Sequence, residues 1–152
     1  MEDLERLLRD HNFLKGLSES HTRLMVSCAK NVRFARGEFL LREGREATTF
    51  YLVRVGNIAL EVNVPGRGVV LMETVGPDDV LGLSWLIPPY HFHLDARAVE
   101  PVVALAFDGT CLRGKMEADH DLGFALTKRL FEKAYRRLER VRLQRLDLYK
   151  AP

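Results

Sequence analysis

Two histidines one residue apart are the candidates for metal chemistry. His91 and His93 have the H-x-H spacing that places two imidazoles on one face of a strand, where they could share a metal ion. Cys28 and Cys111 lack C-x-x-C spacing, so we expect two core thiols rather than a disulfide framework or a zinc site. No Gly-x-Ser-x-Gly, P-loop or His–Cys nucleophile pattern stands out. We therefore expect no enzyme, and two unrelated histidines at the surface or in a cleft.

Aromatic side chains in the same stretch indicate a second chemistry, the binding of a small ligand. They are Trp85, Tyr90, Phe92 and His93, followed by Arg97 as a cation. In the alternative interpretation, Trp85 and Phe92 fill the core and Arg97 forms an ion pair with Asp95. Residues 94–98 alternate like a half-buried strand, which places Asp95 and Arg97 on its outer face. This alternation favours core aromatics and an ion pair over ligand contacts.

A block of short strands between two helical regions must position these residues. Apolar spacing predicts helices in about the first 30 residues, the second over 21–29 with an N-cap within 17–20. From Val32 the period changes to two, and strand patterns follow at 32–34, 38–41, 49–53, 58–64, 69–75, 94–99 and 102–107. Helical spacing returns at 110–118 and in a long helix over about 122–149, with a cap at 119–121.

The composition fits one globular domain of the α+β class. The chain has 152 residues, of which 47% are apolar and 29% charged, and this balance excludes a disordered chain. No apolar run is long enough to span a bilayer, and the acidic start lacks the pattern of a signal peptide, so we expect a cytoplasmic protein. We expect a single domain over 1–152, with a helical N-terminus over 1–30, a β-roll over 31–108 and C-terminal helices over 109–150.

The long helix has an apolar stripe typical of a coiled-coil seam. Its members, at spacings of three and four, are Leu126, Leu130, Ala134, Leu138, Val141 and Leu148, with Arg145 as a polar interruption. The alternative is that the helix packs on its own β-roll. Its last four turns outrun what so small a domain can cover, so we expect a homodimer through this helix. The helix is also rich in Lys and Arg, which we interpret as a solvated face.

Several glycine-anchored segments follow one another in an order that resembles a known family. They are Arg36-Gly37-Glu38, Arg42-Glu43-Gly44, residues 50–56 (FYLVRVG) and residues 75–82 (VGPDDVLG). Their order and separation resemble the cyclic nucleotide-binding domain of the catabolite-activator (Crp/Fnr-like) family of bacterial regulators, over about residues 13–145. The resemblance implies a cupin-like double-stranded β-helix, that is, a β-roll or jelly roll, flanked by N-terminal helices and a long C-terminal helix. It also implies a ligand pocket inside the roll.

The resemblance places a phosphate-binding cassette after Gly82. In the family, a glutamate next to this glycine accepts a hydrogen bond from the ribose, and an arginine near the cassette's end neutralises the phosphate. Here Leu83 stands at the glutamate position and Phe92 at the arginine position, and Pro88-Pro89 shortens the intervening helix to about one turn. Losing both anchors would remove roughly 3–6 kcal/mol of binding energy. We therefore expect no cofactor and no cyclic nucleotide held in the usual way.

The cassette-equivalent pocket is predicted to comprise Gly82, Leu83, Ser84, Trp85, Phe92, His93 and Arg97. This set favours a stand-alone regulatory or interaction protein. The alternative is a sensor of another small anionic ligand or metabolite. A metal-dependent cupin using His91 and His93 is a distant third, because Arg97 and Ala98 stand where a cupin glutamate is needed. Many relatives carry a helix-turn-helix after the long helix, but this sequence stops at Pro152, so we expect no DNA-binding domain. No apolar run could span a bilayer, so we also expect no membrane partner.

Overall fold

Two four-stranded antiparallel sheets form a roll, with helices before and after it in the chain. The structure is a computed structural model that describes the backbone of residues 3–150 and the side chains of residues 3–146. The helices are α1 (Leu4–Asp10), α2 (Glu19–Val26), α3 (Gly109–Ala118) and α4 (His120–Lys150), with 3-10 turns η1 (Asn12–Leu14) and η2 (Leu83–Trp85). The strands are β1 (Ala29–Phe34), β2 (Phe39–Leu41), β3 (Thr49–Val55), β4 (Ile58–Val64), β5 (Gly68–Val75), β6 (Val80–Leu81), β7 (Asp95–Ala98) and β8 (Val102–Asp108). The predicted α+β roll with helices on both sides of it in the chain is confirmed.

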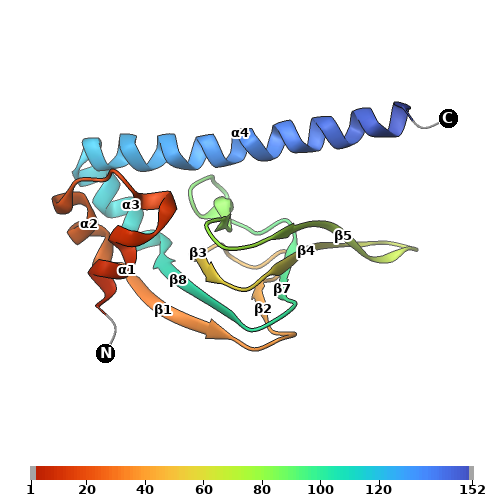
Figure 1. Cartoon of the computed structure of the whole chain (residues 1–152), viewed down its shortest axis with the longest axis horizontal. Coiled ribbons are helices and arrows are strands. Elements are labelled where there is room, and N and C mark those ends of the chain that lie inside the picture. The colour runs from red at the N-terminus through yellow and green to blue at the C-terminus, as the bar shows by residue number, and fades with distance from the viewer. Residues whose placement is uncertain (1–2, 151–152) are drawn as a thin grey trace.

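The two sheets have the strand orders β1-β8-β3-β6 and β2-β7-β4-β5. Figure 1 shows α1, α2 and α3 gathered at one end of the roll, while α4 runs along its length and alongside the β4–β5 hairpin. The sequence did not predict β6, because two residues are too few to show a period. The predicted second helix was also displaced: α2 ends at Val26, and Ala29 already belongs to β1.

Side-chain caps fix where the helices begin. The Ser18 hydroxyl accepts the His21 N–H at 3.2 Å and starts α2, and Asp108 accepts the Cys111 N–H at 2.9 Å and starts α3. Asp119 accepts the Leu122 N–H at 3.1 Å at the start of α4. The caps predicted within 17–20 and 119–121 are therefore confirmed.

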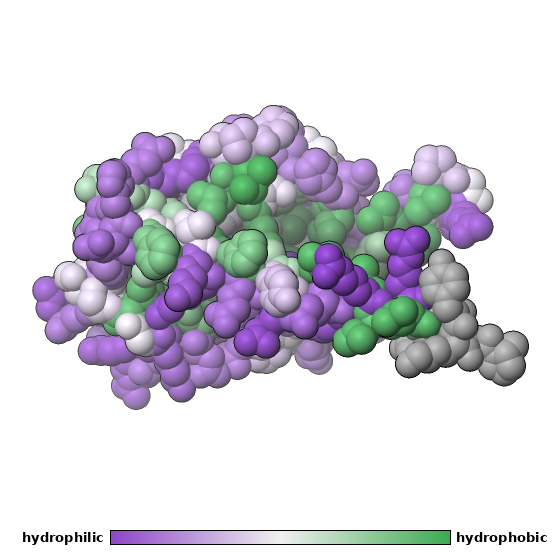
Figure 2. Space-filling view, turned by 90° about the horizontal axis from the view of Figure 1, so that it is seen from above, coloured by the Kyte–Doolittle hydropathy of each residue, from purple (hydrophilic) through white to green (hydrophobic). Residues whose placement is uncertain are grey.

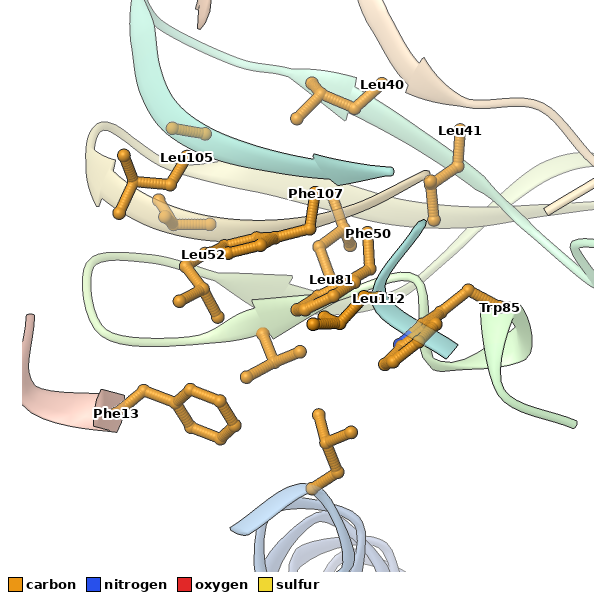
Figure 3. Close-up of a cluster of buried hydrophobic side chains, with 14 of the residues drawn as sticks. Phe13, Leu40, Leu41, Phe50, Leu52, Leu81, Trp85, Leu105, Phe107 and Leu112 are labelled. Atoms are coloured by element: carbon orange, nitrogen blue, oxygen red, sulfur yellow. The ribbon is translucent and has the colours of Figure 1, made fainter. Parts of the chain in front are cut away.

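The core between the sheets is built around three stacked aromatic rings. Phe50 stacks on Phe107 at 4.8 Å on one side and on Trp85 at 4.5 Å on the other. All three side chains are fully buried. Figure 3 shows these rings among leucines contributed by both sheets and by α3, with Phe13 at the edge of the cluster. Trp85 thus anchors η2 to the core.

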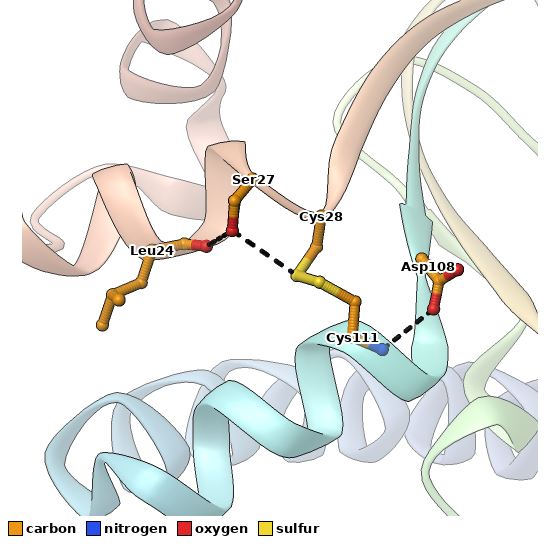
Figure 4. Close-up of a disulfide and its surroundings, with 5 residues drawn as sticks. All are labelled: Leu24, Ser27, Cys28, Asp108 and Cys111. Carbon is orange, nitrogen blue, oxygen red and sulfur yellow. Dashed lines mark hydrogen bonds between the residues drawn. A yellow bond between two sulfur atoms is a disulfide. The ribbon is translucent and has the colours of Figure 1, made fainter.

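Cys28 and Cys111 form a disulfide across 83 residues of sequence, so the expectation of two separate core thiols is wrong. β1 pairs with β8, and this pairing brings the end of α2 beside the start of α3. Figure 4 shows the disulfide between these two helices. Sequence spacing did not reveal the pair, because the sheet register brings the two residues together.

Candidate functional site

The cassette-equivalent segment, residues 82–92, begins at Gly82, directly after β6. This glycine is buried and has a φ of +92°, a conformation that L side chains rarely adopt. η2 follows as a single 3-10 turn, and its last N–H groups bond back to Gly82 and Leu83 at 3.4 and 3.3 Å. The helix of about one turn predicted for this segment is therefore confirmed.

The ring of Phe92 fills the space beside Gly82. A Cβ on Gly82 would lie 3.3 Å from Cε1 of Phe92 and 3.4 Å from Cδ2 of Leu41. The Phe92 backbone is held in place, because its N–H donates to the Arg45 carbonyl at 3.0 Å and its carbonyl accepts the Gly44 N–H at 2.8 Å. Phe92, which the resemblance predicts to stand at the arginine position, is thus a buried ring with a fixed backbone.

Trp85 and Phe92 lie where the core-aromatic interpretation placed them. Trp85 is fully buried and Phe92 is 8% exposed. The indole Nε1–H of Trp85 has no hydrogen-bond partner among the described residues, so no polar contact holds the ring. Leu83 is half-buried against the core cluster, and Ser84 is half-buried as well. Apolar packing therefore fixes this part of the segment.

Arg97 lies on the outer face of β7 and is bound to Glu61 of β4. Its Nε and Nη2 donate to the two Glu61 carboxylate oxygens at 3.0 Å each, and this contact raises the pKa of Arg97 above its usual range. Asp95 lies 3.8 Å from Arg42 and accepts the Glu43 N–H at 2.8 Å. Asp95 and Arg97 do form ion pairs, but with other residues and not with each other. The reason is cross-strand register: Asp95 is opposite Glu61, and Arg97 reaches Glu61 on the diagonal.

The two candidate metal ligands do not assemble a site in the described part of the chain. His91 and His93 are both exposed, on the loop before β7. His91 forms an isolated backbone bridge with Glu46. No group of three His, Cys, Asp or Glu side chains that could hold a metal ion occurs among the described residues. Nothing here supports the metal-dependent cupin.

Arg113 of α3, which sequence reasoning missed, fastens the cassette-equivalent segment to the helices. Its guanidinium donates to the Trp85 carbonyl and lies 4.2 Å from the centre of the Tyr90 ring. A second donor reaches Thr110 Oγ1 at 3.3 Å. One helical side chain therefore holds both ends of the turn and loop after Gly82. Nothing in the sequence pattern marks Arg113 among the many arginines of this chain.

Basic side chains of α4 hold the helix against the roll. Arg137 donates to the Val80 carbonyl on β6, and burial lowers its pKa. Arg140 donates to Glu73 of β5 at 2.8 Å, and Lys133 lies 4.0 Å from Asp79. The basic helix predicted to be a solvated face thus contributes several contacts to its own domain.

The predicted dimer seam on α4 is only partly exposed. Leu126 and Leu130 are 0% and 4% exposed in the core of their own chain, which corrects the prediction at these two positions. Ala134 is half-buried, whereas Leu138 and Val141 are 45% and 56% exposed. The side chain of Leu148 lies outside the described residues. The first turns of the stripe face the roll because α4 must cover the core there.

The model of the family described as "Cyclic nucleotide-binding domain" matches residues 31–119, more than half of the chain. The chain belongs to this family. The resemblance inferred from the glycine-anchored segments is therefore confirmed. No helix in the described part of this cyclic nucleotide-binding domain combines the length and apolar character needed to cross a bilayer.

Solved and curated relatives agree with the family. A Geobacter metallireducens GS-15 protein named for cyclic nucleotide binding has a TM-score of 0.80 at 27% identity, over 91% of this chain and 99% of that one. A cyclic nucleotide-binding domain from Methylobacillus flagellatus KT shares the fold, with a TM-score of 0.79 at 19% identity. Mouse cGMP-dependent protein kinase 2 is 25% identical over 112 residues, which is 73% of this chain but only 14% of the kinase.

Proposed function

We propose that this cyclic nucleotide-binding domain is a regulatory or interaction module, not an enzyme, that does not hold a cyclic nucleotide in the usual way. The observation that supports the proposal is the Phe92 ring packed beside Gly82, at the position that the resemblance assigns to a phosphate-binding arginine. The second anchor is missing too, since Leu83 stands where the family places a glutamate and packs on the core. Arg97 offers no substitute, because Glu61 binds it on the outer face.

The energetic consequence is large enough to decide between binding and its absence. Each hydrogen bond to a charged group contributes about 1.5–3 kcal/mol, so the loss of both anchors costs roughly two to four decades of affinity. A ligand would also have to displace the Phe92 ring. The backbone of Phe92 is fixed, because its N–H and its carbonyl both form hydrogen bonds with the turn at Gly44 and Arg45. We therefore expect millimolar or weaker binding of cyclic AMP and cyclic GMP.

We infer that the module self-associates through the exposed apolar face of α4. Phe124, Phe131, Tyr135 and Leu138 share this face at spacings of seven, four and three, and are 71%, 69%, 49% and 45% exposed. Figure 2, seen from the side on which α4 lies, shows apolar side chains standing out among charged ones. Several exposed aromatic and leucine side chains along one helix face are typical of a protein interface.

The same face is continuous with the cassette-equivalent segment. An apolar groove of about 210 Å³ is lined by Leu83, Leu86 and Ile87 on one side and by Leu130, Phe131 and Ala134 of α4 on the other. A partner helix seated on Phe131 would therefore touch η2 as well. The arrangement supports a regulatory role in which the association state and the position of this segment are linked.

Isothermal titration calorimetry of the full chain with cyclic AMP and with cyclic GMP tests the proposal. A cyclic nucleotide-binding domain that retains both anchors serves as the positive control. We expect the control to bind with micromolar affinity and this chain to show no saturable heat at the same concentrations. Micromolar binding by this chain would overturn the proposal.

A further inference from the structure

The Cys28–Cys111 disulfide joins the connection between α2 and β1 to the start of α3, which follows β8. Cys28 stands between α2 and β1, and Cys111 is the third residue of α3. Around them, the Asp108 N–H donates to the Cys28 carbonyl at 2.9 Å, and the Gly109 N–H donates to the Thr48 carbonyl at 2.8 Å. The disulfide is thus the covalent link between the N-terminal helices and the helix that leads into α4 (Figure 4).

A cavity at the protein surface gives access to this disulfide. It measures about 370 Å³, and both cysteines line it together with Ser27, Lys30 and Asp108. Cys111 is half-buried, whereas Cys28 is only 7% exposed. A thiolate that enters the cavity therefore meets Cys111 as the more accessible partner of the bond. A purely structural disulfide would more often be buried on both sides.

The start of α3 favours a thiolate on Cys111. Cys111 lies in the first turn of a ten-residue helix, where the positive end of the helix dipole stabilises negative charge. Lys30, on the wall of the same cavity, adds a positive charge, while the Asp108 carboxylate opposes it. A stabilised thiolate is a good leaving group in thiol–disulfide exchange, which favours the step that releases Cys111 from a mixed disulfide.

We propose that Cys28–Cys111 is a reversible thiol–disulfide exchange site whose reductant is a dithiol, either a small molecule or a protein with a Cys-x-x-Cys loop. One thiolate of the dithiol attacks Sγ of Cys111, and the S–S bond breaks to release Cys28, which takes up a proton. The second thiol then attacks the mixed disulfide and releases Cys111, while the dithiol closes to its own disulfide. Two electrons pass from the dithiol to the cystine. The predicted cytoplasmic location agrees with this chemistry, since disulfides there are usually transient.

Opening the bond would loosen α3 and, through α3, the cassette-equivalent segment. α3 carries Arg113, which holds the Trp85 carbonyl and the Tyr90 ring. Without the disulfide, the Asp108 N–H still donates to the Cys28 carbonyl, and His21 Nε2 still lies 3.6 Å from the Asp119 carboxylate. The reduced protein therefore keeps its fold but gains freedom at α3 and at residues 83–90.

The first arm of the test measures access. The full chain, without denaturant, is incubated with dihydrolipoic acid, alkylated, and weighed as intact protein. We expect the two cysteines to become alkylatable together while circular dichroism stays unchanged. The proposal is overturned if the purified protein contains no disulfide, or if the cysteines react only after denaturant unfolds the chain.

The second arm measures the consequence by hydrogen exchange of oxidised and reduced protein. Amides of residues 83–90 and 109–118 are expected to exchange roughly tenfold faster after reduction, while those of β4 remain unchanged. The variant Cys28→Ser with Cys111→Ser controls for the reductant and should exchange at the reduced rate with or without it. Equal exchange of oxidised and reduced wild type would contradict the coupling.

Discussion

Arg97 donates to both carboxylate oxygens of Glu61, at 3.0 Å each, across strands β7 and β4. This pairing keeps the one cation predicted for the pocket on the outer face of the sheet. A double-mutant cycle of Arg97→Ala and Glu61→Ala, read from urea denaturation, should give a favourable coupling between the two side chains, because the pair is bidentate. If the changes in the free energy of unfolding of the two single variants simply add up in the double variant, the two side chains do not bind each other in solution.

Phe92→Ala should lower the free energy of unfolding by about 3 kcal/mol, because it leaves a cavity beside Gly82 that the fixed backbone cannot close. Denaturant unfolding measures the effect. Phe39→Ala is the matched control: Phe39 is 39% exposed, and we expect a loss of about 1 kcal/mol or less. Similar losses for the two variants would mean that Phe92 is not packed in the core.

Arg113→Met should loosen the cassette-equivalent segment without unfolding the roll. The substitution keeps the length of the side chain but removes the donors to the Trp85 carbonyl and the contact with Tyr90. We expect faster hydrogen exchange at residues 83–90, by about tenfold, as the loss of a charged hydrogen bond implies. Arg36→Met, at an exposed turn, should leave this exchange unchanged. Unchanged exchange in Arg113→Met would show that Arg113 does not hold residues 83–90 in place.

His11 should make stability depend on pH. Its Nε2 contacts the Val53 carbonyl at 2.9 Å and its Nδ1 accepts the Phe13 N–H at 3.2 Å, an arrangement that fits the neutral ring. Burial lowers the pKa of His11, so the unfolded chain takes up a proton at a higher pH than the folded chain. The free energy of unfolding should therefore fall as the pH decreases through about 6.5, and stay level above about pH 7.5 with respect to this group.

Urea denaturation between about pH 5 and pH 8 measures this dependence. His11→Ala should lose the part of the slope that lies below about pH 6.5. His91→Ala should keep it, because His91 is exposed. Identical slopes in the wild type and in His11→Ala would assign the pH dependence to other groups.

Self-association should depend on the exposed face of α4. Phe131→Asp combined with Leu138→Asp introduces charge on that face, at side chains that are 69% and 45% exposed and contribute little to the core. We expect sedimentation equilibrium to show a dimer for the wild type and a monomer for this variant. Val55→Asp, at a residue 54% exposed on β3, should remain dimeric. A monomeric wild type at high concentration would refute the interface.

Local patterns predicted most of the fold. The β4 strand was predicted over its observed range, and α3 within one residue, because apolar alternation, helical spacing and the flanking glycines agree there. β6 and η1 were not predicted, since two or three residues show no period. The features that the sequence did not predict depend on tertiary pairing. The pairing of β1 with β8 brings Cys28 close to Cys111, and the spacing of the two cysteines in the sequence does not indicate their disulfide.

The candidate site, like the fold, was predicted from the sequence only in part. The assignment of Leu83 and Phe92 to the two anchor positions came from the sequence, since a glycine and a strand nearby define these positions, and it stays a prediction. The partners that fix the segment were not, because Arg113 and Glu61 are distant in sequence and of common residue types. On α4, one stripe served both the core and the surface: Leu126 and Leu130 are buried, while Leu138 is exposed. Sequence spacing alone could not say where the roll stops covering the helix.

We propose that side chains of this cyclic nucleotide-binding domain fill its own cassette-equivalent pocket. A crystal structure of the full chain grown with a large excess of cyclic AMP tests it most directly, through the electron density between Gly82 and Phe92. We expect continuous density for the Phe92 ring against Gly82 and none for a phosphate or ribose there. Density for a cyclic nucleotide at Gly82, with the Phe92 ring turned away, would contradict it.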